Sequence, residues 1–125
     1  MTKIFLYVRG KDDIRGFLSA GHADWAQEGS DIVCAAVSIL TCTCVNALES
    51  VCGLVPRVTA NREGILSFSL PKRTAEEDAR AQILMGALRQ GLSDLAESYP
   101  QYVQLTIQNG DISCPRSASA GAVTE

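Results

Sequence analysis

The order of hydrophobic and polar residues predicts two β-hairpins separated by a long apolar segment. Residues 3–9, KIFLYVR, are rich in β-branched and aromatic side chains, and a GKDD turn separates them from a second extended run over residues 14–20. Such runs on either side of turn residues are typical of a hairpin. Residues 57–60 and 65–70 repeat this arrangement around an NREG turn, so a second hairpin is predicted there.

The long apolar segment predicts a helix. It carries no charged side chain between Asp31 and Glu49, and residues 31–51 are too many for one strand. We predict a helix with Asp31 as its N-cap. A membrane span is the competing interpretation, but the seventeen uncharged residues 32–48 fall short of the roughly 20 that a span needs, so a buried helix is favoured. Without a polar stripe, this helix has to be covered on several sides, by the sheet, the other helix and a second subunit.

The last part of the chain predicts a second helix and a final strand. Thr74 followed by Glu77 matches a capping box, and apolar residues recur after it at helical spacing. The predicted buried stripe comprises Ile83, Ala87, Leu88, Leu92, Leu95 and Ala96. Residues 102–108 alternate between apolar and polar side chains, which indicates a half-buried strand. The chain after Asp111 is small and polar, so residues 112–125 are predicted to form a flexible tail.

These elements follow one another in the order ββαββαβ, with no repeat of motif length. The order predicts a single domain over residues 1–111. A two-layer α+β fold, in which a mixed five-stranded sheet packs with two helices, is the simplest way to bury the apolar faces of both helices.

Composition and charge narrow the functions that are open to the protein. Of 125 residues, 46% are hydrophobic and 20% charged, which is enough apolar material for one core. The net charge is −3 and no basic stripe is interleaved with aromatic residues, so no nucleic-acid partner is expected. The first ten residues, MTKIFLYVRG, lack a signal-peptide pattern. We expect a cytoplasmic protein without a membrane partner.

The cysteine pattern indicates free thiols rather than disulfides or a metal site. Five cysteines are an odd number, and four of them, Cys34, Cys42, Cys44 and Cys52, fall in or next to the predicted apolar helix. No C-x-x-C pair occurs, nor does a P-loop or G-x-G-x-x-G motif, so neither a metal nor another cofactor is expected. Cys42, Cys44 and Cys52 are best interpreted as small core residues.

Cys34 is the one cysteine whose predicted position favours reactivity. With Asp31 as the N-cap, it lies in the first helical turn, where free N–H groups and the helix dipole favour an anion such as a thiolate. The free amides of Cys34 and Ala35 could then form an oxyanion hole. Ser38 lies four positions on along the same helical face, close enough to support the site.

His22 is the only imidazole in the chain and therefore the candidate general base. A loop over residues 23–30, with an aromatic residue in the middle and a glycine near its end, connects it to the helix and suits a mobile lid. Structural alternatives stay open at this point: a single His beside a turn is often a satisfied structural residue, and Cys34 could be core. Asp31 is more readily a helix cap than an orienting group for the histidine.

Two motifs, GHA at residues 21–23 and DIVCAAVS at residues 31–38, together with the segment QILMGALRQGLSDLAESYPQYVQL, resemble the ribosomal-processing cysteine protease Prp family of bacteria. The resemblance covers roughly residues 2–108. It implies a homodimer with a mixed sheet and two helices. The activity it implies is removal of a short N-terminal extension from the precursor of large-subunit ribosomal protein number twenty-seven.

Carried over by position, the resemblance assigns the nucleophile to Cys34 and the base to His22, and it places Asp31 and Ser38 at supporting positions. A rival hypothesis is a non-catalytic ribosome-assembly or peptide-binding module in which Cys34 is merely buried. The two differ in the rate at which Cys34 is alkylated relative to the other cysteines.

Overall fold

The computed structural model describes residues 1–21, 28–62 and 64–110, with the backbone alone for residues 28–31 and 62. In this part of the chain the elements follow the predicted order. They are β1 (Thr2–Arg9), β2 (Asp13–Ala20), α1 (Glu28–Ser50), β3 (Arg57–Arg62), β4 (Ile65–Ser69), α2 (Ala75–Ser98) and β5 (Val103–Asn109). The predicted tail, residues 112–125, lies outside the described residues.

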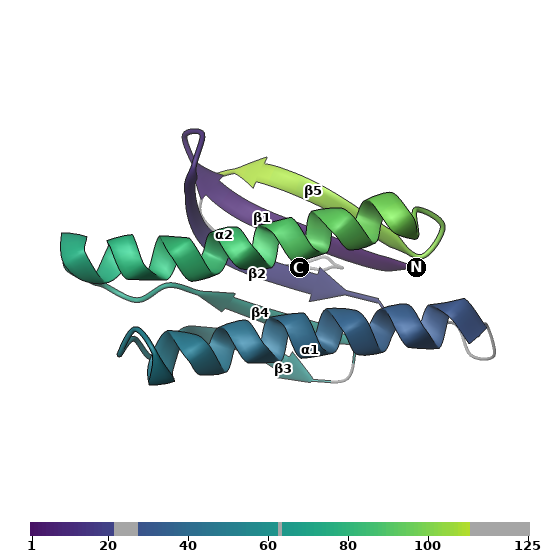
Figure 1. Ribbon diagram of the computed structural model, residues 1–125, viewed down its shortest axis with the longest axis horizontal. Coiled ribbons are helices and arrows are strands. Elements are labelled where there is room, and N and C mark those ends of the chain that lie inside the picture. Colours follow the sequence, from purple (N-terminus) through teal and green to yellow (C-terminus); the bar gives the residue numbers. More distant parts are fainter. Residues whose placement is uncertain (22–27, 63, 111–125) are drawn as a thin grey trace.

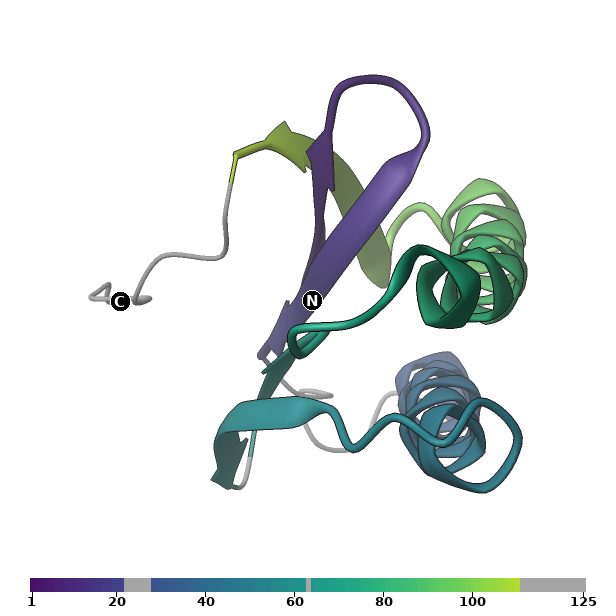
Figure 2. The same ribbon diagram turned by 90° about the vertical axis from the view of Figure 1, so that its left-hand side faces the viewer.

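The described strands form one mixed sheet, covered by both helices on the same face. The strand order is β3-β4-β2-β1-β5 (Figure 1). The edge strand β5 pairs in parallel with β1, and every other neighbouring pair is antiparallel. Figure 2 shows α1 beside the β3–β4 side of the sheet and α2 beside the β1–β5 side. The predicted two-layer α+β fold is therefore confirmed.

The core lies between the sheet and the helices because alternate residues of each central strand point toward the helices. On β1 these residues are Thr2, Ile4, Leu6 and Val8, all buried. From the neighbouring strands, the rings of Phe17 and Phe68 stack with their centroids 5.4 Å apart. Each such side chain stabilises the folded state by roughly 1.5–3 kcal/mol when it is buried. A shift of one residue in strand pairing would move these side chains to the other face, so their burial fixes the register of the sheet.

Helix α1 has one buried face and one exposed face. Val33, Val37 and Leu48 enter the core, whereas Ile32 is 62% and Ile39 is 65% exposed. By length and composition alone, the stretch Ile32–Ser50 would be able to cross a membrane. In the structure its inner face packs against the sheet and α2, as predicted, but its outer face is uncovered.

Helix α2 begins at the predicted capping box. The Thr74 hydroxyl accepts a hydrogen bond from the Glu77 amide at 3.1 Å, and the Glu77 carboxylate accepts one from the Thr74 amide at 2.8 Å. Two such bonds satisfy amides that the first helical turn leaves free.

The buried stripe of α2 is displaced from the prediction. Its fully buried residues are Ala81, Met85, Leu88 and Leu92. Leu88 and Leu92 were predicted correctly, and Leu95 and Ala96 pack partly buried against the core. Ile83 is 75% exposed and Ala87 is also exposed, so their prediction as core residues was wrong. Successive buried residues are four, three and four positions apart, which places them on one face of the helix. Ile83 is rotated by about 200° around the helix axis from Ala81 and therefore lies on the opposite face.

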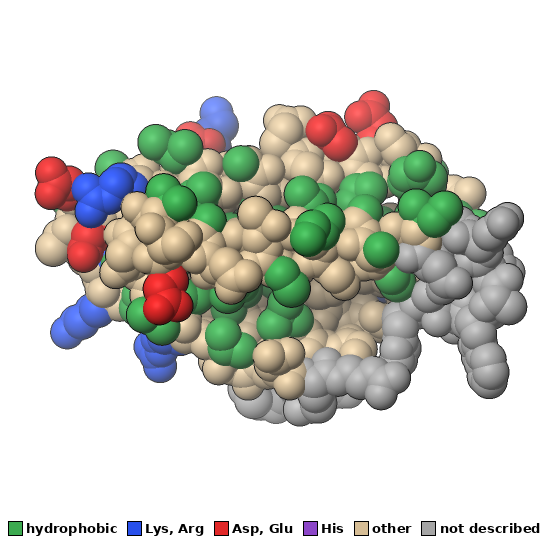
Figure 3. Space-filling view, turned by 60° about the horizontal axis from the view of Figure 1, so that its bottom comes forward, with side chains coloured by type: hydrophobic (Ala, Val, Ile, Leu, Met, Phe, Trp, Pro, Cys, Tyr) green, Lys and Arg blue, Asp and Glu red, His purple; other side chains and the backbone are tan. Residues whose placement is uncertain are grey.

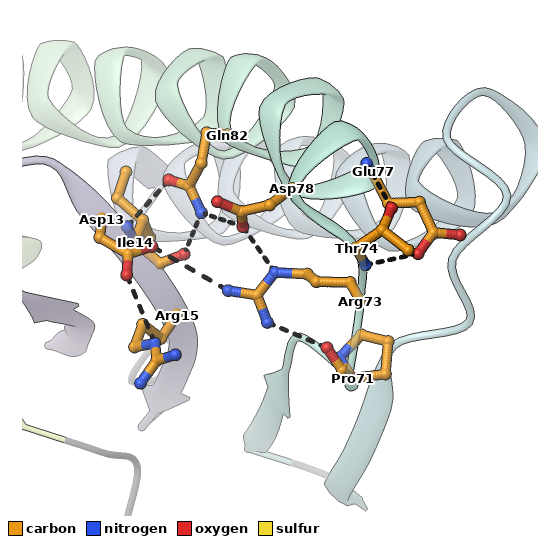
Figure 4. A network of polar contacts seen from close by, with 9 residues as sticks. All are labelled: Asp13, Ile14, Arg15, Pro71, Arg73, Thr74, Glu77, Asp78 and Gln82. Carbon is orange, nitrogen blue, oxygen red and sulfur yellow. Dashed lines mark hydrogen bonds and ion pairs between the residues drawn. The ribbon is translucent and has the colours of Figure 1, made fainter.

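A polar network ties the start of α2 to the start of β2 (Figure 4). The Gln82 side chain accepts a hydrogen bond from the Ile14 amide at 2.9 Å and donates one to the Ile14 carbonyl at 2.8 Å. Arg73 donates to Asp78 and to the carbonyl of Pro71. These bonds fix the end of the sheet that is remote from Cys34.

At the opposite end, the start of β1 closely approaches the end of β2 at Gly21. The backbone of Gly21 has φ +99°, a conformation that residues with a Cβ rarely adopt. A Cβ at this position would lie 2.5 Å from the Met1 carbonyl oxygen. The Gly21 amide also donates to the Gly64 carbonyl at 2.9 Å. This glycine is therefore required both by its dihedral angle and by lack of space.

Replacing Asp78 tests the polar network. Burial raises the pKa of its carboxyl, but hydrogen bonds from Arg73 and Gln82 and the charges of Arg73 and Arg15 outweigh this, so the pKa lies below its ordinary value. The stabilisation is present above the unfolded-state pKa and is lost as pH falls through the lower folded-state pKa. Asp78→Asn should lower the free energy of unfolding by about 0.5–1 kcal/mol at neutral pH, measured by urea denaturation.

The difference between Asp78→Asn and the unmodified protein should shrink below about pH 4, where the carboxylate becomes protonated. Asp94→Asn is the matched control on the exposed side of α2, where Asp94 accepts a hydrogen bond from Gln90 at 3.0 Å. If Asp78→Asn lost as much stability below about pH 4 as at neutral pH, the assigned role of the Asp78 charge would be contradicted.

A second prediction concerns Gly21. Gly21→Ala should destabilise the protein by about 2–4 kcal/mol, because a methyl group adds a clash with the Met1 carbonyl to the cost of a positive φ. Gly53→Ala separates the two causes: Gly53 has φ +74° but nothing within 4 Å of its Cβ position, so only about 1 kcal/mol is expected. Urea unfolding measures both, and equal losses would show that the close approach costs nothing.

Candidate active site

Cys34 lies beside a cleft of about 290 Å³ between the first half of α1 and the ends of the strands. Its α1 wall is formed by Cys34, Val37, Ser38, Thr41 and Cys42. Its opposite wall is formed by Thr2, Ser19, Gly21, Asn61, Gly64, Ile65 and Leu66. None of these lining residues is charged, and the lining contains both hydroxyl groups and apolar side chains.

Strand register explains which sheet residues reach the cleft. Ser19 pairs with Ile4 on one side and with Leu66 on the other, and Leu66 pairs in turn with Asn61. Residues paired directly across neighbouring strands point to the same face of a sheet. Ile4 is a core residue on the face toward the helices, so Ser19, Leu66 and Asn61 also lie on that face.

Cys34 is partly exposed and in contact with the start of β1. Its Sγ lies 3.7 Å from the hydroxyl oxygen of Thr2, so α1 contacts the first residue of β1. Ser38 is exposed on the next turn of α1 and lines the same cleft, so the structure brings Cys34 and Ser38 together, as expected from their spacing.

The predicted N-cap at Asp31 is wrong. Helix α1 begins at Glu28, so Asp31 is the fourth and Cys34 the seventh residue of the helix. In an α-helix of this length the amides of Cys34 and Ala35 bond to carbonyls four residues earlier. They are therefore not free donors, and the predicted oxyanion hole made of these amides does not exist in this helix. The error arose because Asp31 is the last charged residue before the apolar run, although the helix extends into the polar segment before it.

His22 and residues 23–27 of the predicted lid lie outside the described residues, and the side chain of Asp31 is not described. Their predicted roles stay predictions. The residue before His22 is nevertheless well placed: Gly21 lines the same cleft as Cys34. The chain thus enters the His22 segment from the wall of this cleft.

The remaining cysteines differ in exposure. Cys44 and Cys52 are buried, as predicted, and burial together with the nearby Cys52 raises the pKa of Cys44 to about 11. Cys42 is exposed, so its prediction as a core residue was wrong. Its side chain lines the cleft instead of entering the core. All four cysteines of the described ranges are free, and Cys114 lies outside them.

The described side chains do not gather three His, Cys, Asp or Glu residues around a common point that could hold a metal ion. The site that they form consists instead of a thiol among hydroxyls. Sequence reasoning missed the contribution of Thr2, because the hydrophobic pattern predicts a first strand that starts at residue 3. A signal was present: the alternation of β1 extends back through Thr2 on its apolar face.

The sequence of this chain is similar to those of known proteins. The sequence model of the family described as Cysteine protease Prp matches residues 1–104. The ribosomal processing cysteine protease Prp of Bacillus subtilis (strain 168) is 28% identical over 95 residues, which are 74% of this chain and 85% of that protein.

Solved structures show the same fold. SMU.848 from Streptococcus mutans is 30% identical, with a TM-score of 0.78 over 88% of this chain and 96% of that chain. The essential ribosomal processing protease Prp from S. aureus, in complex with a substrate peptide, is 21% identical, with a TM-score of 0.75 over 86% of this chain and 100% of that chain. With the family match spanning both walls of the cleft, this chain belongs to the Cysteine protease Prp family and is a cysteine-type peptidase.

Proposed function

We propose that this protein is an endopeptidase that removes the short N-terminal extension of large-subunit ribosomal protein number twenty-seven, with Cys34 as nucleophile and His22 as general base and acid. The observation that carries the proposal is a partly exposed Cys34 in a cleft that Gly21, the neighbour of His22, also lines. The names of the Bacillus subtilis relative and of the S. aureus structure, a ribosomal processing protease bound to a substrate peptide, support the substrate class.

The surroundings of the cysteines favour Cys34 over the other described thiols. Cys44 and Cys52 are buried away from the cleft, and the raised pKa of Cys44 keeps its thiol protonated at neutral pH. Cys42 is exposed and lines the cleft, but it lies eight residues, or about 12 Å along the helix axis, beyond Cys34. Cys34 is the cleft cysteine nearest to the strand end from which the His22 segment departs.

The mechanism that follows is acyl transfer through a thioester. The Cys34 thiolate attacks the scissile carbonyl, and the tetrahedral intermediate collapses when His22 protonates the leaving amine. Water, deprotonated by His22, then attacks the thioester, and the thiolate is regenerated as the acid product leaves. Because the helix start leaves no free amide at Cys34 or Ala35, the oxyanion must be stabilised by other donors of the cleft.

The lining of the cleft suits an uncharged, extended peptide. Val37, Ile65 and Leu66 offer apolar contacts, and the hydroxyl and amide groups of Ser19, Ser38 and Asn61 can bond to a peptide backbone. We propose that large apolar side chains of the precursor lie in this cleft. We propose that the protein acts in the cytoplasm, because the ribosomal proteins that would be its substrates are made there.

We also propose that the protein is a homodimer. The outer faces of α1 and α2 carry exposed Ile32, Ile39 and Ile83, and a groove of about 230 Å³ between the two helices has an apolar lining that includes Ile39, Leu84 and Leu88. Figure 3 shows hydrophobic side chains across the middle of this region of the surface, with most charged side chains toward its edges. Covering such a surface with a second copy removes apolar area from water.

The nucleophile is tested by incubating the purified protein with the candidate ribosomal precursor and reading the products by intact mass. Cys34→Ala should abolish cleavage and leave the fold and precursor binding largely intact, since only the sulfur is lost. His22→Ala should slow cleavage by about 10²–10⁴-fold, the usual contribution of a general base.

The control for Cys34→Ala is Cys42→Ala, which removes another exposed thiol from the same helix and should still cleave the precursor. Turnover by Cys34→Ala would refute the nucleophile. Binding of the precursor by the unmodified protein without any cleavage would instead favour the peptide-binding module as its function.

The proposed dimer predicts that a charge on the outer face of α1 separates the subunits. Ile39→Asp should shift the mass measured by light scattering from two copies to one, because an unpaired carboxylate cannot be buried without a large cost. Val58→Asp is the matched control, since Val58 is 47% exposed on the edge strand β3 and away from the groove. A dimer that persists in Ile39→Asp, or a monomer in the unmodified protein, would contradict this interface.

A further inference from the structure

The inward face of β1 contains one polar residue where an apolar one would suffice. Thr2, Ile4, Leu6 and Val8 point toward the helices and are at most 4% exposed. Valine has nearly the shape of threonine and would pack in the same space without burying a hydroxyl. A buried hydroxyl costs about 1–3 kcal/mol unless it is hydrogen-bonded, so the presence of threonine here depends on its partner.

That partner is the sulfur of Cys34. The Thr2 hydroxyl oxygen lies 3.7 Å from Cys34 Sγ, and among the residues that the structure describes this hydroxyl has no other polar contact. The backbone around it is held firmly: the Thr2 amide donates to the Tyr102 carbonyl at 2.8 Å, and Thr2 pairs with Val103 in the parallel β1–β5 ladder. The hydroxyl is thus presented to the sulfur from a rigid strand.

The direction of this hydrogen bond depends on the ionisation of Cys34. Either group can donate while the sulfur is a thiol, but a thiolate has no hydrogen, so only the threonine hydroxyl can donate to it. Hydrogen bonds to an ionised acceptor are stronger than those between neutral groups. The contact therefore favours the thiolate, which is the nucleophilic form.

The described residues that line the cleft offer the sulfur no compensating charge. The cleft residues from α1, β1, β2, β3 and β4 are uncharged, and Cys42 is the only other titratable side chain among them. Met1 and Thr2 also approach Gly21, with the Met1 carbonyl 2.5 Å and the Thr2 Cα 3.7 Å from its Cβ position. The start of β1 therefore touches both the helix that carries Cys34 and the strand end that precedes His22.

We propose that Thr2 is a positioning residue for the nucleophile: its hydroxyl donates a hydrogen bond to the Cys34 thiolate and holds the sulfur at the wall of the cleft. The inference rests on Cys34 being the nucleophile. No atom is transferred by Thr2. Once the thiol has lost its proton to His22, threonine is the donor of this bond, and the bond is broken when the sulfur attacks the substrate carbonyl and its charge moves to oxygen.

The decisive comparison is between Thr2→Val and Thr2→Ser. Thr2→Val keeps the packing and removes the hydroxyl, whereas Thr2→Ser keeps the hydroxyl and removes a methyl group. Thr2→Val should unfold at the same or a higher urea concentration, because a buried hydroxyl is lost, yet its kcat should fall about tenfold with little change in KM. Thr2→Ser should retain most of the kcat even if it is less stable.

A second readout does not depend on any peptide substrate. Iodoacetamide labelling, followed by peptide mass mapping that resolves each cysteine, gives the alkylation rate of Cys34 alone. In Thr2→Val this rate should fall about tenfold at pH 7, because the hydroxyl that donates to the thiolate is lost. Thr59→Val is the control, because it removes a β3 hydroxyl that bonds to Ser67 outside the cleft.

The proposal is overturned if Thr2→Val matches the unmodified protein in neutral-pH alkylation, or if Thr2→Ser loses as much as Thr2→Val. These outcomes are separate from failure of the proposed function. Turnover by Cys34→Ala would remove the nucleophile itself, whereas the alkylation rates decide the role of Thr2 even if the chosen precursor is not cleaved.

Discussion

The close approach of the first residues of β1 to Gly21 and to Cys34 is the constraint on which the site depends. Three elements meet there: the start of β1, the end of its hairpin partner β2 and the second turn of α1. Only a residue without a Cβ can follow β2 at this point. The sheet therefore determines, through backbone contacts alone, where the chain that carries His22 leaves the cleft wall.

A polar network lies at one end of the sheet, and the cleft lies at the other. In the network, Arg73, Asp78 and Gln82 connect α2 to β2 through hydrogen bonds and ion pairs (Figure 4). At the other end, the described cleft residues are neutral. The described hydrogen bonds and ion pairs of Arg73 and Asp78 therefore lie away from the cleft that contains Cys34.

Much of the fold could be predicted from the sequence because the local signals agree with one another. Both hairpins, the capping box at Thr74 and the last strand have turn residues and hydrophobic periods that indicate the same elements. The start of α1 could not be placed, because the polar residues before Asp31 carry no distinctive cap signal. The exposure of Ile83 and Cys42 was missed for another reason: composition shows that a helix is apolar, but not which of its faces the sheet covers.

The sequence predicts the candidate reactive residues of the site, but not the residues from other elements that surround them. Cys34 and Ser38 share a helical face, so their proximity follows from spacing alone. The contact between Thr2 and Cys34 spans 32 positions and depends on the packing of α1 over the start of β1, which no local pattern specifies. A threonine at an apolar strand position is a signal only once its neighbour is known. The one polar residue on the inward face of β1 thus lies where that strand meets the helix that carries Cys34.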